Sequence, residues 1–231
     1  MPNIEQGSVI RLTCEPNDLY VKRTKKPTLS SNGLFTFRIP KRLSCIIARV
    51  LHGFLCANLV VARRAGSNPK ESMIDIELNA PMGKQLVALE LDDDEVLSFD
   101  LEYLVAFSRD LKLWTEIEFS WSAFGVHRNF IQNAQGPGRV VFEINGKGDV
   151  SGGRQVAFSP CRLVAWTPKI LFGFCGIRSY LDMYLNDILV ETKDAPDGSI
   201  LVLDADMHDG QGATNRLRNL WEMLKRVYWP L

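Results

Sequence analysis

The chain has few of the residues around which metal and catalytic sites are usually built. Its three histidines, His52, His127 and His208, lie far apart in the sequence and form no pair with metal-ligand spacing. The five cysteines include no C-x-x-C pair, so we expect free thiols in a reducing compartment rather than disulfides or a zinc ribbon. Phosphate-binding loops, G-x-G-x-x-G turns and G-x-S-x-G elbows are also missing. These gaps predict a protein that is not an enzyme and that uses no metal or cofactor.

Two short stretches resemble reactive motifs and then depart from them. "DADMHDGQGATN" begins like a calcium loop, with Asp204 and Asp206 at positions one and three. Asp209 then stands where the tight-turn glycine belongs, and Asn215 stands where the bidentate glutamate belongs, so we interpret the stretch as an acidic loop. "SNPK", which starts at Ser67, has the S-x-x-K spacing of acyl-serine enzymes but lies in a loop and lacks the companion lysine motif.

Long uninterrupted apolar runs are also absent. The most apolar stretch, "CIIARVLHGFLCANLVVA", is broken by Arg49, His52 and Asn58, and a membrane-spanning helix needs about 18 apolar residues. Buried strands are the favoured interpretation of this stretch. The N-terminus shows no basic start followed by an apolar run, which predicts that there is no secretory signal and that the protein is cytoplasmic.

Charge is balanced over the whole chain but divided along it. Residues 1–70 carry twelve Lys and Arg against three Asp and Glu, whereas residues 71–110 carry two against eleven. Such blocks are typical of nucleic-acid or membrane surfaces, or of segments that contact each other within one fold or across a subunit interface. We favour mutual contact, and we interpret "DDDEV" as a solvated turn between strands. A sequence pI of about 6.8 argues against nucleic-acid binding.

Strand signals dominate what the sequence does contain. Short runs such as "SMIDIEL", "QLVALEL", "GRVVFEI" and "SILVLDA" are rich in β-branched and aromatic residues, and clusters of Gly, Pro, Asn and Asp separate them. Residues 206–231 differ, because their apolar residues fall at helical spacing from Leu217 to Tyr228. We therefore predict an amphipathic C-terminal helix that packs on its own β-core, on another subunit or on a membrane surface. The candidate interaction surface on this helix is Arg216, Arg218, Trp221, Lys225, Arg226 and Trp229.

An internal repeat is the most informative pattern. "LVAFSRDL" begins at Leu104 and "LVAWTPKI" begins at Leu163, an offset of 163 − 104 = 59. The similarity extends over residues 97–111 and 156–170, and it predicts two equivalent hairpins that stack within one core. A fainter third copy is expected in "FTFRIPKRLSCI", near residue 36. The predicted domains are an N-terminal β unit at 1–80, a repeated core at 81–205, and a linker with the helix at 206–231.

The order of these motifs resembles the altered-inheritance-of-mitochondria family of bacterial and mitochondrial proteins. The similarity is carried by Leu89-Glu90-Leu91, by Leu104 to Phe107, and by the Gly-Pro-Gly-Arg-Val turn that starts at Gly136. Two segments depart from the family pattern, since "SAFGVHRNFI" keeps one glycine and "LNDILVETKD" replaces a second Gly-Pro-Gly turn. The resemblance implies an all-β fold of repeated double-stranded β-helix units. That architecture is similar to the tryptophan-attenuation RNA-binding proteins, with kinship to scramblase-like and tubby-like domains and no catalytic residues.

From these patterns we expect a non-enzymatic binding or scaffold protein that forms a homo-oligomer. One alternative is a peripheral protein of anionic membrane surfaces, which the basic N-terminal third and the Trp-flanked helix would favour. Further alternatives are an RNA-binding protein and a metal-dependent cupin-like enzyme. No small-molecule ligand is indicated by the sequence.

Overall fold

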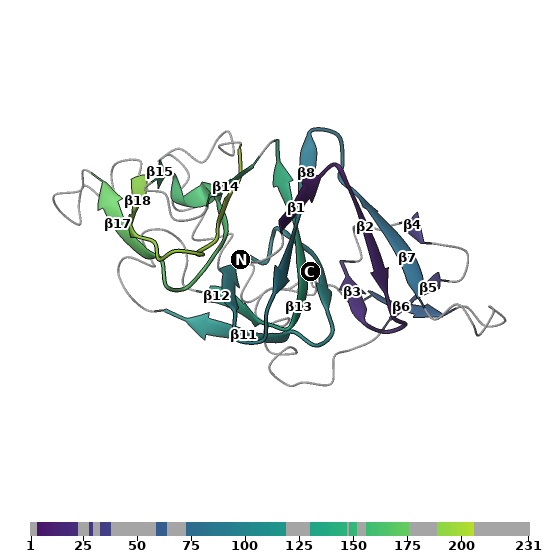
Figure 1. Cartoon of the computed structure of the whole chain (residues 1–231). Coiled ribbons are helices and arrows are strands. Elements are labelled where there is room, and N and C mark those ends of the chain that lie inside the picture. Colours follow the sequence, from purple (N-terminus) through teal and green to yellow (C-terminus); the bar gives the residue numbers. More distant parts are fainter. Residues whose placement is uncertain are drawn as a thin grey trace.

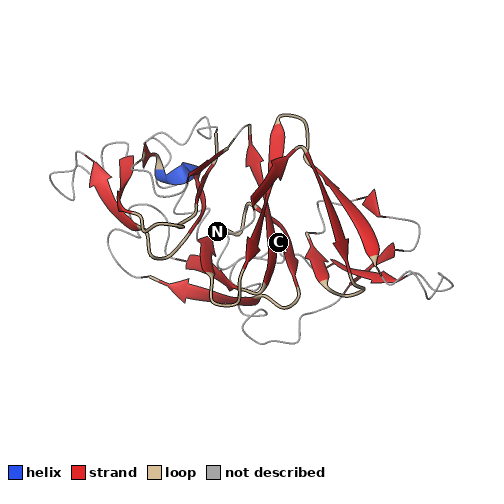
Figure 2. Ribbon diagram, viewed as in Figure 1, coloured by secondary structure: helices blue, strands red, loops and turns tan. Residues whose placement is uncertain are grey.

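Strand formation follows from short runs of β-branched and aromatic residues between turn-forming Gly, Pro, Asn and Asp. The computed structural model describes residues 4–22, 28–29, 33–37, 59–63, 73–118, 130–146, 148–151, 156–175 and 189–205. These residues are all-β apart from one 3-10 turn, η1 (Pro160–Arg162), shown in blue in Figure 2. The predicted all-β class is therefore confirmed. The predicted C-terminal helix lies outside the described residues.

The strands are β1 (Ile4–Gly7), β2 (Val9–Cys14), β3 (Leu19–Val21), β4 (Thr28–Leu29), β5 (Gly33–Phe37), β6 (Leu59–Arg63), β7 (Ile74–Asn79), β8 (Lys84–Leu91), β9 (Val96–Phe99), β10 (Leu104–Ser108), β11 (Lys112–Ile117), β12 (Phe130–Gln135), β13 (Gly138–Asn145), β14 (Asp149–Ser151), β15 (Ala157–Phe158), β16 (Leu163–Trp166), β17 (Leu171–Cys175), β18 (Leu189–Asp194) and β19 (Leu201–Leu203). Within the described ranges, membrane-crossing helices, which must be both long and apolar, were not found.

Four antiparallel sheets contain these strands. A seven-stranded sheet has the order β1-β8-β13-β10-β3-β6-β5, and a six-stranded sheet has the order β11-β12-β9-β16-β19-β14. Two three-stranded sheets, β2-β7-β4 and β15-β18-β17, lie at opposite ends of the molecule, and the larger sheets lie between them (Figure 1). The molecule is thus a row of sheets, with one small sheet closing each end.

The strand order divides the described chain into three units with the same pairing. Unit 1 is β2–β7, unit 2 is β8–β13 and unit 3 is β14–β19. In each unit the first, sixth and third strands form one group, which we call the first triplet: β2-β7-β4, β8-β13-β10 and β14-β19-β16. The second, fifth and fourth strands form the second triplet: β3-β6-β5, β9-β12-β11 and β15-β18-β17.

Neighbouring units are joined edge to edge. β10 of unit 2 pairs with β3 of unit 1, and β16 of unit 3 pairs with β9 of unit 2. Each large sheet therefore combines the first triplet of one unit with the second triplet of the preceding unit. The N-terminal strand β1 adds to β8 at the far edge of the seven-stranded sheet.

The two repeated stretches form equivalent strand pairs in the chain, β9–β10 and β15–β16, but the prediction that they are hairpins is wrong. β9 and β10 belong to different sheets, as do β15 and β16, and the two strands of each stretch pair with other strands instead of with each other. Leu104 and Leu163 begin β10 and β16, and both strands show the same register shift one residue later, against β13 and β19 respectively. The preceding aromatic positions, Phe99 and Phe158, are both fully buried. The interpretation of "FTFRIPKRLSCI" as a third copy is wrong: its described part belongs to β5, which pairs with β6 as β11 pairs with β12. The strands of unit 1 that correspond to the repeated stretches are β3 and β4, which contain fewer apolar residues than the stretches in units 2 and 3.

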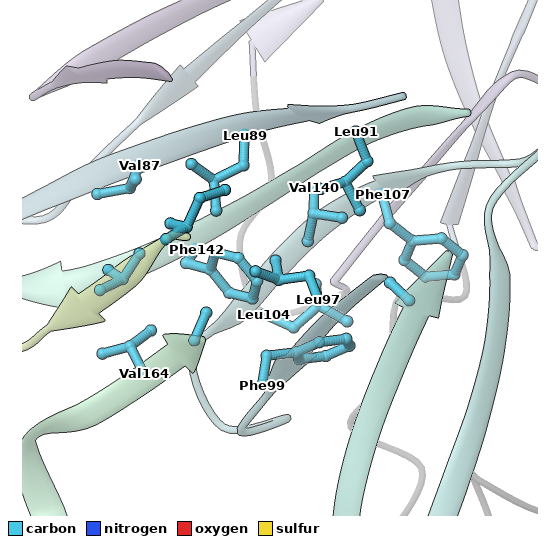
Figure 3. Packing of buried hydrophobic residues seen from close by; sticks show 14 of the residues in the cluster. Val87, Leu89, Leu91, Leu97, Phe99, Leu104, Phe107, Val140, Phe142 and Val164 are labelled. Atoms are coloured by element: carbon cyan, nitrogen blue, oxygen red, sulfur yellow. The ribbon is translucent and has the colours of Figure 1, made fainter. Parts of the chain in front are cut away.

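Three hydrophobic clusters fill the spaces between successive sheets. The largest lies between the two large sheets and contains Leu89, Phe99, Leu104, Phe107 and Phe142, among others (Figure 3). Phe99 and Phe142 meet with ring centroids 5.4 Å apart. Fully burying a side chain of this size contributes about 1.5–3 kcal/mol, so this cluster is a major source of stability.

Burial also explains the two kinds of apolar pattern. β8 and β13 pack on both faces, and their central residues form continuous buried runs. β2 and β7 at the end of the row alternate buried and exposed residues, because only one of their faces meets another sheet.

Candidate interaction edge

The interaction surface predicted on the C-terminal helix cannot be placed on the fold. Arg216, Arg218, Trp221, Lys225, Arg226 and Trp229 all lie outside the described residues, as do His52, His127 and His208. Among the residues that the structure does describe, no three His, Cys, Asp or Glu side chains gather where they could hold a metal ion.

Asp204, the first residue of the calcium-like stretch, has a structural role. Its carboxylate is buried and accepts two hydrogen bonds from Asn145, one from the backbone N–H and one from Nδ2, each 2.8 Å long. The Asp204 backbone carbonyl also accepts a hydrogen bond of 2.7 Å from Nε of Arg162. Both carboxylate oxygens of Asp204 thus accept hydrogen bonds from Asn145. The sequence pattern did not predict that Asp204 is buried.

The acidic turn after β8 is exposed, as expected from the sequence. Asp92, Asp93 and Asp94 line a hollow of about 570 Å³ with Pro137 and Gly138. Acidic side chains alone do not define a binding site, and none of the described residues that line this hollow is basic or aromatic. The turn is interpreted as a solvated connection between β8 and β9.

In the part of the chain that the structure describes, the thiols of Cys14 and Cys175 are free, and neither is activated. Burial is the main cause that raises the pKa of the Cys14 thiol to about 11, and the nearby Asp18 and Asp75 carboxylates add to the effect. Cys175 lies 3.1 Å from a carboxylate oxygen of Glu191, and this hydrogen bond is the main reason that its pKa is also raised. A nucleophilic cysteine requires the opposite shift.

The outer face of the sheet β2-β7-β4 is polar. Arg11 and Glu77 form an ion pair of 3.1 Å on it, and Thr13 donates a hydrogen bond of 2.8 Å to Asp75. Thr28 on β4 is exposed beside them. In solenoid proteins, a polar outer face marks the terminal unit that ends the stack. Unit 1 has this character.

The position of these polar residues is informative when compared with unit 2. Thr28, Glu77 and Arg11 lie opposite one another across β4, β7 and β2. Their counterparts across β10, β13 and β8 are Ala106, Val141 and Ala88, which are buried against unit 1. Unit 2 therefore packs on its neighbour through small and apolar residues, at the positions where unit 1 carries polar ones.

At the opposite end of the molecule, β15 forms an edge of the sheet β15-β18-β17. Its equivalents in the other units, β3 and β9, are each paired on both sides. Within the described ranges, no strand pairs with the second side of β15. This edge is the candidate functional feature of the fold, because exposed strand edges bind other strands.

The surroundings of β15 suit such pairing. Ala157 is exposed, whereas Phe158 is buried and stacks edge-on against Phe172. A hollow of about 430 Å³ lies beside the strand, lined by Val156, Ala157 and residues 191–193 of β18. The sequence analysis did not predict this edge. The repeat could have indicated it, because in a series of units joined edge to edge the second triplet of the last unit has no following unit to pair with.

Comparison with known proteins supports the fold alone. No family model and no curated protein matches the chain. Among solved structures, the crystal structure of protein SPYM3_0169 from Streptococcus pyogenes is similar over 98% of this chain and 98% of that chain. The TM-score is 0.56 and the sequence identity is 14%. The chain thus has the same overall fold as this streptococcal protein.

Proposed function

We propose that this chain is a non-enzymatic scaffold or binding protein that assembles with copies of itself. The units are proposed to be of the double-stranded β-helix type, as in the family that the sequence resembles. Three units with one pairing scheme support this proposal, because each unit completes the sheet of its neighbour.

The observation that carries the proposal is the way in which units join. Both internal junctions are made by edge pairing, β10 with β3 and β16 with β9. Among the described strands, the two end sheets contain three each, and β4 and β15 lie at their edges. A fold built by adding triplets to sheet edges thus presents strand edges of the same kind at its ends, and such edges favour association.

Static light scattering coupled to size exclusion tests the proposal. The chain has a mass of 26.1 kDa. We expect a mass of at least two chains at micromolar concentration. Backbone pairing depends little on ionic strength, so the mass should also persist between 0.1 and 1 M salt, where surface charge interactions are screened. A mass of one chain at all concentrations up to about 100 μM would contradict self-assembly.

A further inference from the structure

We propose that two copies of the chain pair through β15, strand against strand, around a two-fold axis. This inference rests on the proposed self-assembly and specifies its interface. The resulting sheet would have the order β17-β18-β15-β15-β18-β17, in which each copy contributes its last three-stranded sheet.

The internal junctions provide the template for this contact. On β3, the N–H that follows the strand, at Lys22, donates to the carbonyl of Val105 over 2.8 Å. On β9, the corresponding N–H at Asp100 donates to the carbonyl of Val164 over 2.9 Å. The same side of the same strand is therefore bonded in units 1 and 2. In unit 3 that side belongs to β15.

Backbone geometry directs Ala157 toward the open side. The N–H of Thr192 donates to the carbonyl of Val156 over 3.1 Å, so the Val156 carbonyl faces β18. The N–H of Val156 also bonds within the sheet, to Oγ1 of Thr192 at 2.9 Å. Because backbone groups alternate sides along an antiparallel strand, the N–H and C=O of Ala157 point away from β18. They form a donor and acceptor pair that a second β15 could satisfy reciprocally.

The strand β15 itself lacks the usual protection of an edge. Its two residues are uncharged, and the charged side chains nearby belong to β18: Glu191 lies opposite Ala157, and Lys193 packs over Gly173. Leu171 and Leu189 are both substantially exposed, at 59% and 43%. Charged residues and prolines within an edge strand are the common devices against association, and β15 has neither.

Head-to-tail joining of β15 to β4 of another copy is disfavoured by the chain itself. In the internal junctions, edge pairing also brings the outer face of a first triplet against the preceding unit, as for Ala106 and Val141. The same contact made by unit 1 would bury Thr28, Glu77 and Arg11 on an apolar surface. Burying a charged pair in this way costs several kcal/mol per ion unless hydrogen bonds compensate for it. Pairing of β15 with its own copy avoids this cost and gives a closed dimer.

Replacement of Ala157 by proline tests the contact. Proline removes the outward N–H of Ala157 but none of the hydrogen bonds to β18, so the sheet should remain intact. We expect Ala157→Pro to weaken dimerisation at least tenfold in Kd, measured by sedimentation equilibrium. Ala157→Ser, which keeps the N–H and is nearly the same size, should dimerise like the parent chain. Circular dichroism and thermal unfolding verify that each variant is folded.

A cysteine cross-link provides the second measurement, and it remains decisive if the proline variant does not fold. In Ala157→Cys under mild oxidation, peptide mapping should identify a disulfide between residue 157 of the two copies. A mixture of Ala157→Cys with Thr28→Cys should give no 157–28 link. An oligomer that lacks the 157–157 link, or that is unchanged by Ala157→Pro, overturns the β15 contact but leaves self-assembly standing. A chain that is monomeric at all concentrations overturns both, and a 157–28 link would establish head-to-tail assembly instead.

Discussion

Asp204 and Glu143, two buried carboxylates, occupy equivalent places in units 3 and 2. The N–H of Asp204 donates to the carbonyl of Arg162 over 2.7 Å, and the N–H of Glu143 donates to the carbonyl of Tyr103 over 2.8 Å. Asp204 directly follows the segment of β19 that pairs with β16, and Glu143 directly follows the segment of β13 that pairs with β10. Glu143 also forms an ion pair of 2.8 Å with Lys84, whereas Asp204 is satisfied by Asn145. The same position thus carries a buried carboxyl side chain in both units.

Replacement of Asp204 tests this structural role. Asp204→Ala would leave the backbone N–H and the Nδ2 group of Asn145 without their acceptors, and each buried unsatisfied group costs about 1–3 kcal/mol. We expect the free energy of unfolding to fall by about 2–4 kcal/mol, measured by urea denaturation. Asp93→Ala, on the exposed turn after β8, serves as the control and should change stability by less than about 0.5 kcal/mol. A loss for Asp204→Ala as small as that of the control would refute the assignment.

Asp18 gives a prediction with a defined pH dependence. Burial, followed by repulsion from Asp110 and Glu15, raises the pKa of the Asp18 carboxyl above its ordinary value, although Arg109 opposes the shift. A carboxyl whose pKa is raised on folding favours the folded state when protonated, and this contribution is lost as pH rises through its unfolded and folded pKa values.

We therefore expect Asp18→Asn to unfold at higher urea concentration than the parent chain at pH 7. The difference should shrink as pH falls below about 4, near the ordinary pKa of aspartate. Denaturation midpoints measured between pH 3 and 8 check this, with Asp93→Asn as a matched control for the loss of one exposed acidic charge. A gain at pH 7 that is no larger than that of the control would rule out the burial effect at Asp18.

At the scale of elements, the sequence repeat was predictable because its two copies are buried in the same way, whereas the hairpin pairing expected within each copy was wrong. Phe107 in β10 and Trp166 in β16 occupy equivalent positions, and both side chains are buried in the core. Both positions therefore carry a large aromatic residue, which makes the repeat visible in the sequence. The copy in unit 1 was misplaced because β3 and β4 are short and lie partly at the end of the row. Because only one face of the sheet β2-β7-β4 is buried, Thr28 is tolerated at the position where β10 has the buried Ala106. Such substitutions make the copy in unit 1 hard to recognise in the sequence.

The acidic turn and the β15 edge show a second limit. "DDDEV" was correctly interpreted as a solvated turn because charge near a tight turn depends on local sequence alone. In units 1 and 2, the partner on this side of the strand comes from the following unit, far along the sequence. No local sequence pattern indicates whether β15 has such a partner. Pairing across more than fifty residues, as between β16 and β9, is visible only in the folded chain.

At the scale of the whole molecule, the row of units ends differently on its two sides. Unit 3 ends in an uncharged strand edge, and unit 1 ends in the polar row of Thr28, Glu77 and Arg11. A chain that self-associates through one end only, with a polar surface at the other end, forms a closed dimer. A chain with two complementary binding ends would form open chains or rings. The polar row is thus predicted to set the upper limit of assembly.

Conversion of the polar row to its unit 2 counterpart tests that limit. In the triple variant Thr28→Ala, Glu77→Val and Arg11→Ala, the face should pack on another copy as Ala106, Val141 and Ala88 pack on unit 1. We expect species larger than a dimer whose mass grows with concentration, measured by light scattering. Addition of Ala157→Pro should abolish them, because the complementary edge is then blocked. The double variant Glu90→Val and Arg139→Ala removes a similar ion pair, 3.5 Å long, from β8 and β13 and should remain dimeric. Growth in this control, or none in the triple variant, would show that the row does not terminate the stack.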